Sequence, residues 1–201
     1  MDINRPKQRK KEQLIQAILD AAEELILEQG YANLRMRKIA RKINYSATAI
    51  YKYFSNKSEI VYHIMQNIFT QMVTEYRAVL SEDIPDPVRR LKKVLKISIK
   101  YAVDNPSHYK MALLFDMSQL EEHGENETSL QPFYIIVELV EQCIKEGYII
   151  NKDPVIIAQG FYATVHGITS LLILRRDFPW KDKEALIEHI LDTQINGLRS
   201  S

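Results

Sequence analysis

The chain has 201 residues, of which 46% are hydrophobic and 26% are charged, a composition that excludes wholesale disorder and favours a globular protein with a sizeable core. A single cysteine, Cys143, excludes a disulfide framework within the chain and favours a reducing compartment. The N-terminus lacks the apolar core of a signal peptide and no apolar run approaches the length of a membrane span, so we expect a cytoplasmic protein without membrane contact.

The charge is unevenly divided along the chain. The formal net charge is only +1, but residues 1–66 hold 12 Lys and Arg against 7 Asp and Glu, whereas the remainder holds 15 against 19. A basic head on a more acidic body indicates that only the head meets a polyanion, although an asymmetry of this size also arises by chance.

The first predicted elements are two helices. The arm over 5–11 has no apolar periodicity and is expected to be frayed. From Gln13 onward, apolar residues recur at helical spacing until Gly30, which suits the left-handed position that follows a helix. A second, shorter helix is expected from an N-cap at Asn33 to Ile43.

A tight turn then leads to a third and a fourth helix. The turn lies at Asn44 and Tyr45, because asparagine tolerates a positive φ. Ser46 is expected to cap a third helix that runs to about Tyr53, and a fourth follows over 57–80. Two short helices joined by a turn, after a longer supporting helix, are the layout of a helix-turn-helix unit, whose last helix enters the major groove of DNA.

The third helix has the composition that entry into a groove requires. Ala47 and Thr48 are small, so the backbone can approach DNA closely, whereas Ile50 and Phe54 form an inward anchor four residues apart. The remaining positions supply hydrogen-bond donors and stacking rings: Tyr51, Lys52 and Tyr53.

This ordered set of residues resembles the TetR family of tetracycline-repressor-like regulators. The family's Ile-Ala pair, serine-started third helix and Lys-Glu-like start of the fourth helix are matched by Ile39, Ala40, Ser46, Ile50, Tyr51, Tyr53, Phe54, Lys57 and Glu59. The supporting helix matches through Ala21, Ala22, Leu25, Gly30 and Tyr31, and the chain departs from family usage at Leu34, Arg35, Asn44, Ala47 and Thr48. The resemblance implies a DNA-binding domain over 1–56 that contacts a double-stranded operator through Arg35, Arg37, Ser46, Ala47, Thr48, Tyr51, Lys52, Tyr53 and Lys57.

The remainder, 57–201, is predicted to be a helical ligand-binding and dimerisation domain, which makes the fold class all-α. Helices are expected at about 87–104, 107–117, 130–147, 153–175 and 182–198. The stretch 118–129 is acidic, polar and aperiodic, which predicts a mobile loop.

The last two long helices are the expected dimer interface. The segment 161–167 resembles the Trp-x-x-x-His-Gly segment of one TetR subgroup, with an aromatic residue in place of the tryptophan. Gly160 and Gly167 lie seven residues apart on nearly one helix face, where a close helix–helix approach would offset their low helix propensity. The resemblance implies a homodimer with interface candidates Val155, Gly160, Gly167, Ile168, Leu172, Leu186, Ile190 and Leu191; alternatively, this face packs only within the subunit.

A cavity for a small molecule is expected inside the body, because a body built only to dimerise does not need three further helices. Apolar walls with a few polar tips are the usual make-up of such sites, and few cations cluster there, which favours an apolar or weakly polar compound. The candidate lining residues, each of which could equally be plain core, are Tyr101, Tyr109, Met111, Phe115, Tyr134, Phe161, Tyr162 and His166.

Together these patterns predict a ligand-responsive repressor. The five histidines are scattered without metal-ligand spacing, and no phosphate loop or nucleophile motif occurs, so we expect no metal, no cofactor and no catalytic residue. Two alternatives stay open: a helical DNA-architectural protein without a ligand response, and a small all-helical enzyme.

Overall fold

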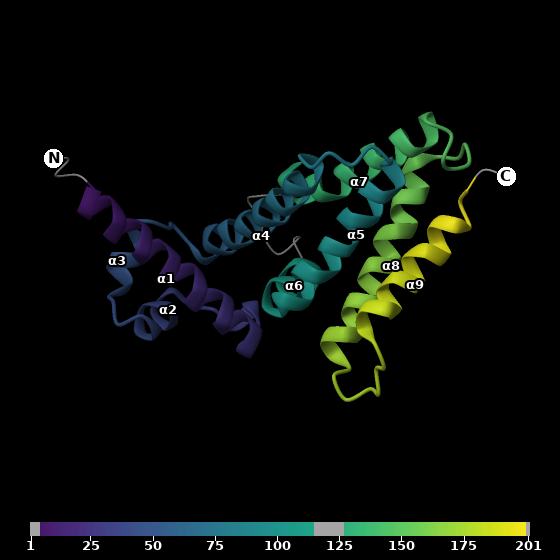
Figure 1. The fold of residues 1–201 in the computed structure, drawn as a ribbon. Helices are drawn as coiled ribbons and strands as arrows, with labels where there is room; N and C mark the ends of the chain where they lie inside the picture. Colours follow the sequence, from purple (N-terminus) through teal and green to yellow (C-terminus); the bar gives the residue numbers. More distant parts are fainter. Residues whose placement is uncertain (1–4, 115–126, 200–201) are drawn as a thin grey trace. The chain divides into compact units, whose positions relative to one another are not determined.

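The computed structural model describes residues 5–114 and 127–199, and both stretches are helical with short connections (Figure 1). The elements are α1 (Arg5–Gln29), the 3-10 turn η1 (Tyr31–Asn33), α2 (Met36–Lys42), α3 (Ala47–Tyr51), α4 (Lys57–Leu80), α5 (Pro87–Asp104), α6 (Pro106–Leu114), α7 (Glu127–Lys145), α8 (Pro154–Leu174) and α9 (Lys183–Asn196). In these two stretches no β-strand forms, and one isolated bridge joins Ile149 to Arg199. The predicted all-α class is confirmed.

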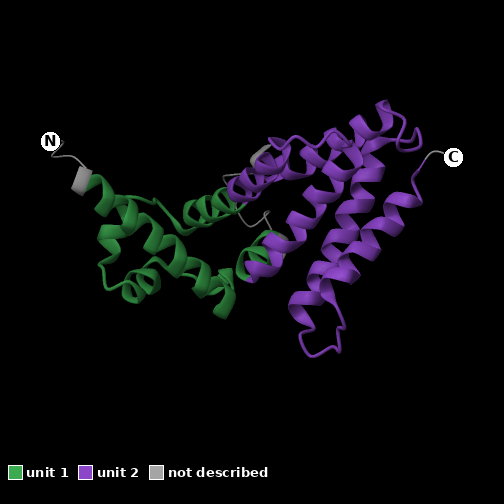
Figure 2. Ribbon diagram, viewed as in Figure 1, with its two compact units in different colours: residues 1–68, 107–126 green, residues 69–106, 127–201 purple. Residues whose placement is uncertain are grey.

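The chain divides into two compact units (Figure 2). Unit 1 comprises residues 1–68 and 107–126, and unit 2 comprises residues 69–106 and 127–201. α4 begins in unit 1 and ends in unit 2, so one continuous helix belongs to both. The domain boundary predicted after residue 56 falls within unit 1. It separates two expected functions and not two compact units, so it remains a prediction.

The N-terminal arm differs from the expectation of a frayed segment, because α1 already begins at Arg5. Apart from Pro6 at the start, the residues of the arm are lysine, arginine and glutamine, which are good helix formers without any apolar contact. Gln8 also donates to the Glu12 carboxylate at 2.9 Å, one turn further on. Apolar periodicity therefore missed a helix that propensity alone predicts.

The second and third helices are shorter than expected. Asn33 is no N-cap: it ends η1 and its amide donates to the Gln29 carbonyl at 2.8 Å. α2 begins instead at Met36, and α3 ends at Tyr51, after which the Tyr53 N–H donates to the Ile50 carbonyl at 2.8 Å in a turn.

Unit 2 is built around α5, α7 and α8. α5 and α8 each begin with a proline behind an aspartate N-cap, Asp86 and Asp153, and Asp182 caps α9. Buried side chains of α5, α7 and α8 form one core, which includes Cys143. Burial raises the pKa of the Cys143 thiol to about 12, so this cysteine packs in the core as a neutral side chain.

Two expectations about the body need correction. α8 is long and apolar enough to span a membrane by length and composition alone, contrary to our expectation that no run approaches that length; a core helix passes the same test, and one face of α8 packs into the core of unit 2. The predicted loop 118–129 lies mainly outside the described residues, and its end is helical because α7 begins at Glu127.

Candidate functional site

The turn between α2 and α3 is fixed by one backbone conformation and one cap. Asn44 has a φ of 59°, in the left-handed region that asparagine tolerates, and the Tyr45 N–H donates to the Ala40 carbonyl at 2.9 Å. The Ser46 hydroxyl accepts a hydrogen bond from the Ala49 N–H at 3.2 Å and so caps α3, as predicted. These local bonds give α3 a defined direction after α2.

The inner edge of α3 is anchored in the core of unit 1. Ile50 and Phe54 are buried, and the Phe54 ring meets the His63 ring edge-on with a centroid distance of 5.5 Å. α4 thus provides part of the surface on which the recognition segment rests.

The outer face of α3 carries small and hydrogen-bonding side chains. Tyr51 is 55% exposed, and Tyr45 in the preceding turn is 52% exposed, so neither phenol serves mainly to fill the core. The other predicted contacts of this segment are exposed or half-buried: Ser46, Ala47, Thr48, Lys52 and Tyr53. We did not predict Tyr45, although its position in the turn, outside the apolar periodicity, was a usable signal.

Two predicted DNA contacts, Arg35 and Lys57, meet at the η1 turn. The Lys57 ammonium donates to the Tyr31 carbonyl at 3.1 Å and lies 4.0 Å from the centroid of the Tyr31 ring. The Arg35 guanidinium donates to the carbonyls of Ala32 at 2.5 Å and Leu34 at 2.9 Å. Burial lowers the pKa of Lys57, and the nearby positive charge of Arg35 lowers that pKa further.

A third cation, Lys38, reaches the same region by donating to the Gln29 side-chain carbonyl at 2.7 Å. Every acceptor of these three cations is a neutral oxygen, and no carboxylate pairs with any of them within 5–114 and 127–199. Lys42 of α2 is different, because Glu24 holds it at 2.7 Å. The η1 turn therefore gathers positive charge that no described carboxylate neutralises, while Arg37 is exposed elsewhere on α2.

The start of α4 fixes the backbone of Lys57. The Asn56 side chain accepts a hydrogen bond from the Glu59 N–H at 2.8 Å, and the Glu59 carboxylate accepts one from the Ser55 N–H at 2.6 Å. This reciprocal cap ties down the first turn of the helix, so Lys57 projects from a rigid segment.

The predicted ligand residues are only partly brought together. In unit 2 the Tyr162 ring lies against the His166 ring, with a centroid distance of 4.1 Å and a tilt of 59°. It meets the Phe133 ring edge-on at a centroid distance of 6.1 Å, and the Phe133 and Tyr134 ring centroids are 5.8 Å apart. Tyr162 is 44% exposed, so this aromatic cluster opens to the surface of unit 2. Burial lowers the pKa of His166, which favours a neutral imidazole.

The other predicted ligand residues lie elsewhere. Phe161 is buried in the core of unit 2, and the Tyr101 hydroxyl donates to the Gln71 side chain at 3.0 Å. Tyr109 and Met111 are buried and belong to unit 1, whereas Phe115 lies outside the described residues.

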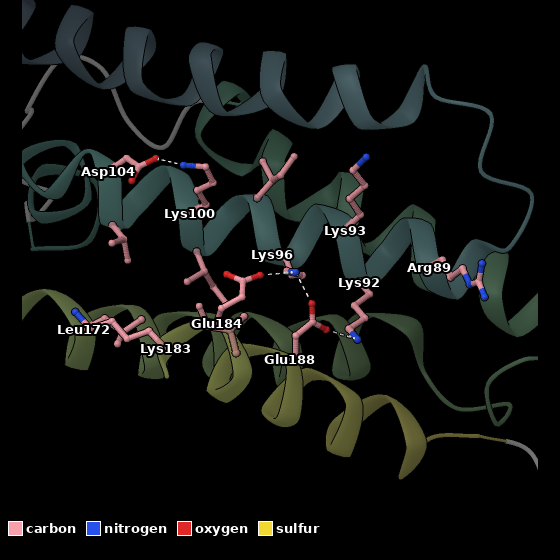
Figure 3. A pocket seen from close by; sticks show the side chains of 14 residues that line it. Arg89, Lys92, Lys93, Lys96, Lys100, Asp104, Leu172, Lys183, Glu184 and Glu188 are labelled. Carbon is pink, nitrogen blue, oxygen red and sulfur yellow. Dashed lines mark hydrogen bonds and ion pairs between the residues drawn. The ribbon is translucent and has the colours of Figure 1, made fainter. Parts of the chain in front are cut away.

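A groove of about 670 Å³ lies between α5 and α9 of unit 2 (Figure 3), and none of the predicted ligand residues lines it. Its lining combines apolar and acidic side chains with six basic ones: Arg89, Lys92, Lys93, Lys96, Lys100 and Lys183.

Carboxylates match these cations. Lys92 pairs with Glu188 at 2.5 Å, and Lys96 pairs with Glu184 at 2.7 Å and also with Glu188 (Figure 3). Lys92 also pairs with Asp192 at 2.6 Å. Arg89 pairs with Asp86, Lys93 with Glu82 and Lys100 with Asp104. The lining and its ion partners therefore carry no large net charge, which does not favour the binding of anions. The ion pairs of Lys92 and Lys96 join α5 to α9.

α8 leaves a broad apolar face uncovered in unit 2. Ile156 is 63% exposed and Leu174 is 59% exposed, and between them Gly167 has no atom within 4 Å of the position that a Cβ would occupy. The predicted interface residues Val155 and Gly167 lie on this face.

The remaining predicted interface residues lie off that face. Leu186 and Ile190 are half-buried on α9, whereas Ile168, Leu172 and Leu191 are buried within the protomer. A Cβ at Gly160 would lie 3.3 Å from the Gln194 side chain, so this glycine already accommodates α9 of its own chain.

Comparison with known proteins identifies relatives of the N-terminal segment and of the whole chain. A family model described as bacterial regulatory proteins, tetR family, matches residues 18–64, which include η1, α2 and α3. The nucleoid occlusion factor SlmA of Aliivibrio fischeri is 24% identical over 195 residues, covering 94% of this chain and 97% of that protein. Its counterpart from Vibrio cholerae is 24% identical over 180 residues, covering 85% and 87%.

Solved structures share the fold along almost the whole chain. The fatty acid degradation regulator FadR of Bacillus halodurans is similar with a TM-score of 0.74 at 20% identity, covering 93% of this chain and 97% of that one. The TetR family transcriptional regulator PfmR of Thermus thermophilus is similar with a TM-score of 0.69 at 19% identity, covering 91% and 99%. The likeness therefore extends through the body as well as the helix-turn-helix.

Proposed function

This chain belongs to the tetR family of bacterial regulatory proteins, and on that premise we propose that it is a transcription repressor that binds a palindromic operator as a homodimer and is released by a small-molecule inducer. The observation that carries this proposal is the exposed surface of α3 and of the turn before it, where Tyr51 of α3 and Tyr45 of the turn are exposed and Ile50 anchors the helix in the core. A short helix with small and hydrogen-bonding groups outward fits the major groove.

The exposed face of α8 supports the homodimer. One helix-turn-helix reads few base pairs, and two of them on one duplex read half-sites about 34–36 Å apart or a multiple of that. An apolar helix face with glycine at its centre is suited to close packing against a second copy, and burying it removes side chains such as Ile156 and Leu174 from water.

The aromatic cluster of Tyr162, His166 and Phe133 supports the inducer site. Neutral imidazole and phenol groups on an aromatic wall suit an apolar or weakly polar compound. α4 is the element through which the compound would act, because it is continuous from Lys57 in unit 1 to Leu80 in unit 2. A compound that prefers one orientation of α4 would change the spacing of the two recognition helices.

Selection of bound duplexes from fragmented genomic DNA tests the proposal. We expect a palindromic sequence to be enriched, and Tyr51→Phe to weaken its binding about two- to tenfold per subunit through the loss of one hydrogen bond. Tyr148→Phe is the matched control, because Tyr148 is also an exposed tyrosine but lies in unit 2. Recovery of no common sequence, or equal effects of both substitutions, would contradict the proposal.

A second candidate function rests on the relatives named nucleoid occlusion factors, which match 94% of this chain in the case of Aliivibrio fischeri. In that function the protein binds DNA with little sequence preference and needs no inducer. A screen of apolar acids and their thioesters, chosen because one solved relative is a fatty acid degradation regulator, separates the two. A compound that releases DNA favours the repressor, whereas many dispersed sites and no such compound favour the second function.

A further inference from the structure

The η1 turn gathers three cations, an arrangement that the helix-turn-helix motif does not require. Arg35 is the N-cap residue before α2, Lys38 lies on α2 and Lys57 begins α4. Among the described residues, each of these three cations is held by neutral oxygens only. Bringing like charges together is unfavourable unless an anion completes the arrangement. By contrast, the half-buried lysines Lys92, Lys93 and Lys96 are paired with carboxylates, and so is the exposed Lys42, with Glu24.

We infer that Tyr31 is a positioning residue that holds the Lys57 ammonium, beside Arg35, as a clamp for a phosphodiester of the DNA backbone. The inference rests on the proposed DNA-binding function and adds to it a residue that does not itself touch DNA. Tyr31 provides two attractions that leave the positive charge intact: its carbonyl at 3.1 Å and its ring face at 4.0 Å from the ammonium.

A carboxylate at this place would hold the ammonium more strongly but would also neutralise it. A ring face attracts a cation through its quadrupole and carries no net charge, so the field of Lys57 remains available to a phosphate. The ammonium has three N–H donors, of which the Tyr31 carbonyl takes one, and the remaining donors can meet an oxygen anion. Burial lowers the pKa of Lys57, and the neighbouring charge of Arg35 lowers it further. A phosphate that arrives beside the ammonium would raise this pKa again.

Lysine has a flexible stem and loses side-chain entropy when it binds. By restricting the stem before DNA arrives, Tyr31 lowers the entropy lost on binding, and this gain exists only while Lys57 is present. The contribution of Tyr31 to DNA affinity should therefore depend on Lys57, whereas a residue that merely supports the fold would contribute with or without it.

A double-mutant cycle on duplex DNA tests the inference. The variants are Tyr31→Leu, Lys57→Ala and their combination, with Tyr31→Phe as the conservative variant and Lys42→Ala as a lysine of the same unit that is paired with a carboxylate. The probe is a mixed-sequence duplex of about three helical turns, because phosphate contacts do not require the operator sequence. Affinity is measured against salt concentration.

We expect Lys57→Ala to lower the salt slope by about one unit per subunit. Tyr31→Leu should weaken binding about two- to fivefold per subunit in the presence of Lys57 and have no further effect in the Lys57→Ala background, whereas Tyr31→Phe should bind like the wild type. Equal losses from Tyr31→Leu in both backgrounds would overturn the inference, because they would mean a structural role. A wild-type protein that fails to bind any duplex would overturn the proposed function and this inference together.

A spectroscopic readout is independent of binding. Methylene protons next to an ammonium that lies over a ring face are shifted upfield by the ring current, so the Lys57 ε-protons should show this shift in the wild type and in Tyr31→Phe but not in Tyr31→Leu. If Tyr31→Leu does not fold, phenylalanines of increasing fluorination at position 31 keep the shape of the ring while removing its negative face. Affinity for the duplex should then fall stepwise with fluorination, and constant affinity across the series would overturn the inference.

Discussion

Tyr76 of α4 illustrates how a single buried hydroxyl constrains unit 2. Its oxygen lies 2.5 Å from the Ser98 hydroxyl, which in turn donates to the Val94 carbonyl at 2.8 Å. Since Ser98 has only one proton to give, the Tyr76 O–H must donate to Ser98. Ionisation of Tyr76 would remove the proton that it donates to Ser98 and so break this hydrogen bond. Burial opposes the ionisation and raises the pKa of Tyr76 to about 12.

This arrangement predicts a loss of stability in alkali. A folded-state pKa of about 12 against an ordinary value of 10.0 means that the contribution of Tyr76 is complete below pH 10 and declines as the pH rises towards 12. Chemical unfolding between pH 8 and 12 should show a decline in the wild type that is shallower in Tyr76→Phe. At neutral pH the same substitution should cost about 1 kcal/mol.

Tyr134→Phe is the control for that titration. Tyr134 is exposed, so its removal should leave the alkaline decline unchanged. If Tyr76→Phe and Tyr134→Phe decline in parallel with the wild type, Tyr76 does not contribute to the alkaline transition.

Between elements, the ion pairs that join α5 to α9 contribute an electrostatic stabilisation that depends on pH and salt. Glu188 pairs with both Lys92 and Lys96, and these contacts lower the pKa of Glu188 below its ordinary value of 4.5. A lowered folded-state pKa means that the contribution is present above pH 4.5 and is lost as the pH falls through the folded value. The pairs are partly exposed, so salt should weaken them.

We therefore expect Glu188→Gln to lower the free energy of unfolding by about 1 kcal/mol at pH 7 and low salt. The difference from the wild type should shrink in about 1 M salt, where the Debye length is about 3 Å, and also in acid. Urea unfolding of both proteins at several salt concentrations measures this difference in the free energy of unfolding. Glu138→Gln removes an exposed carboxylate of α7 that has no ion pair within the described ranges, and a similar loss from it would refute the role of these ion pairs.

The exposed face of α8 makes a prediction about assembly. Gly167 has open space around the position of a Cβ, so Gly167→Arg should leave the protomer folded, while placing a bulky charge in the centre of the proposed interface. Analytical ultracentrifugation should detect a monomer, and circular dichroism should detect an unchanged helix content.

Leu172→Glu distinguishes assembly from folding. Leu172 is buried within the protomer, so a glutamate there should unfold unit 2 rather than separate two intact subunits. If Gly167→Arg remains a dimer, the interface lies elsewhere on the chain.

At the scale of the whole molecule, the sequence predicted where the helices lie along the chain better than it predicted what covers each apolar face. Apolar periodicity located α4, α5 and α8, because their buried stripes repeat at helical spacing. Periodicity also selected Ile168 and Leu172 as interface candidates, yet they are buried in the protomer. A repeat shows that a face is apolar but not which neighbour covers it.

In the candidate DNA-binding surface, the sequence predicted those features for which a residue type has a strong local preference. Asn44 at a positive φ and Ser46 as an N-cap are of this kind. The contact between Lys57 and Tyr31 was not predictable, because it joins residues 26 positions apart across a 3-10 turn that no local pattern indicated. Contacts of that range depend on how the helices pack.

Coupling between the two ends of the molecule gives the last prediction. If an inducer weakens operator binding by a given factor, the operator must weaken inducer binding by the same factor, because both factors describe one thermodynamic cycle. For a coupling of about 1–3 kcal/mol the factor lies between about 5 and 150. Isothermal titration of the compound with and without operator measures one factor, and fluorescence anisotropy of labelled operator with and without compound measures the other. Tyr162→Ala, in the aromatic cluster, should weaken binding of the compound in both titrations while operator affinity without compound stays unchanged. Two unequal factors would mean that the compound acts on the DNA or on the dimer equilibrium, and not through a site on the folded protein.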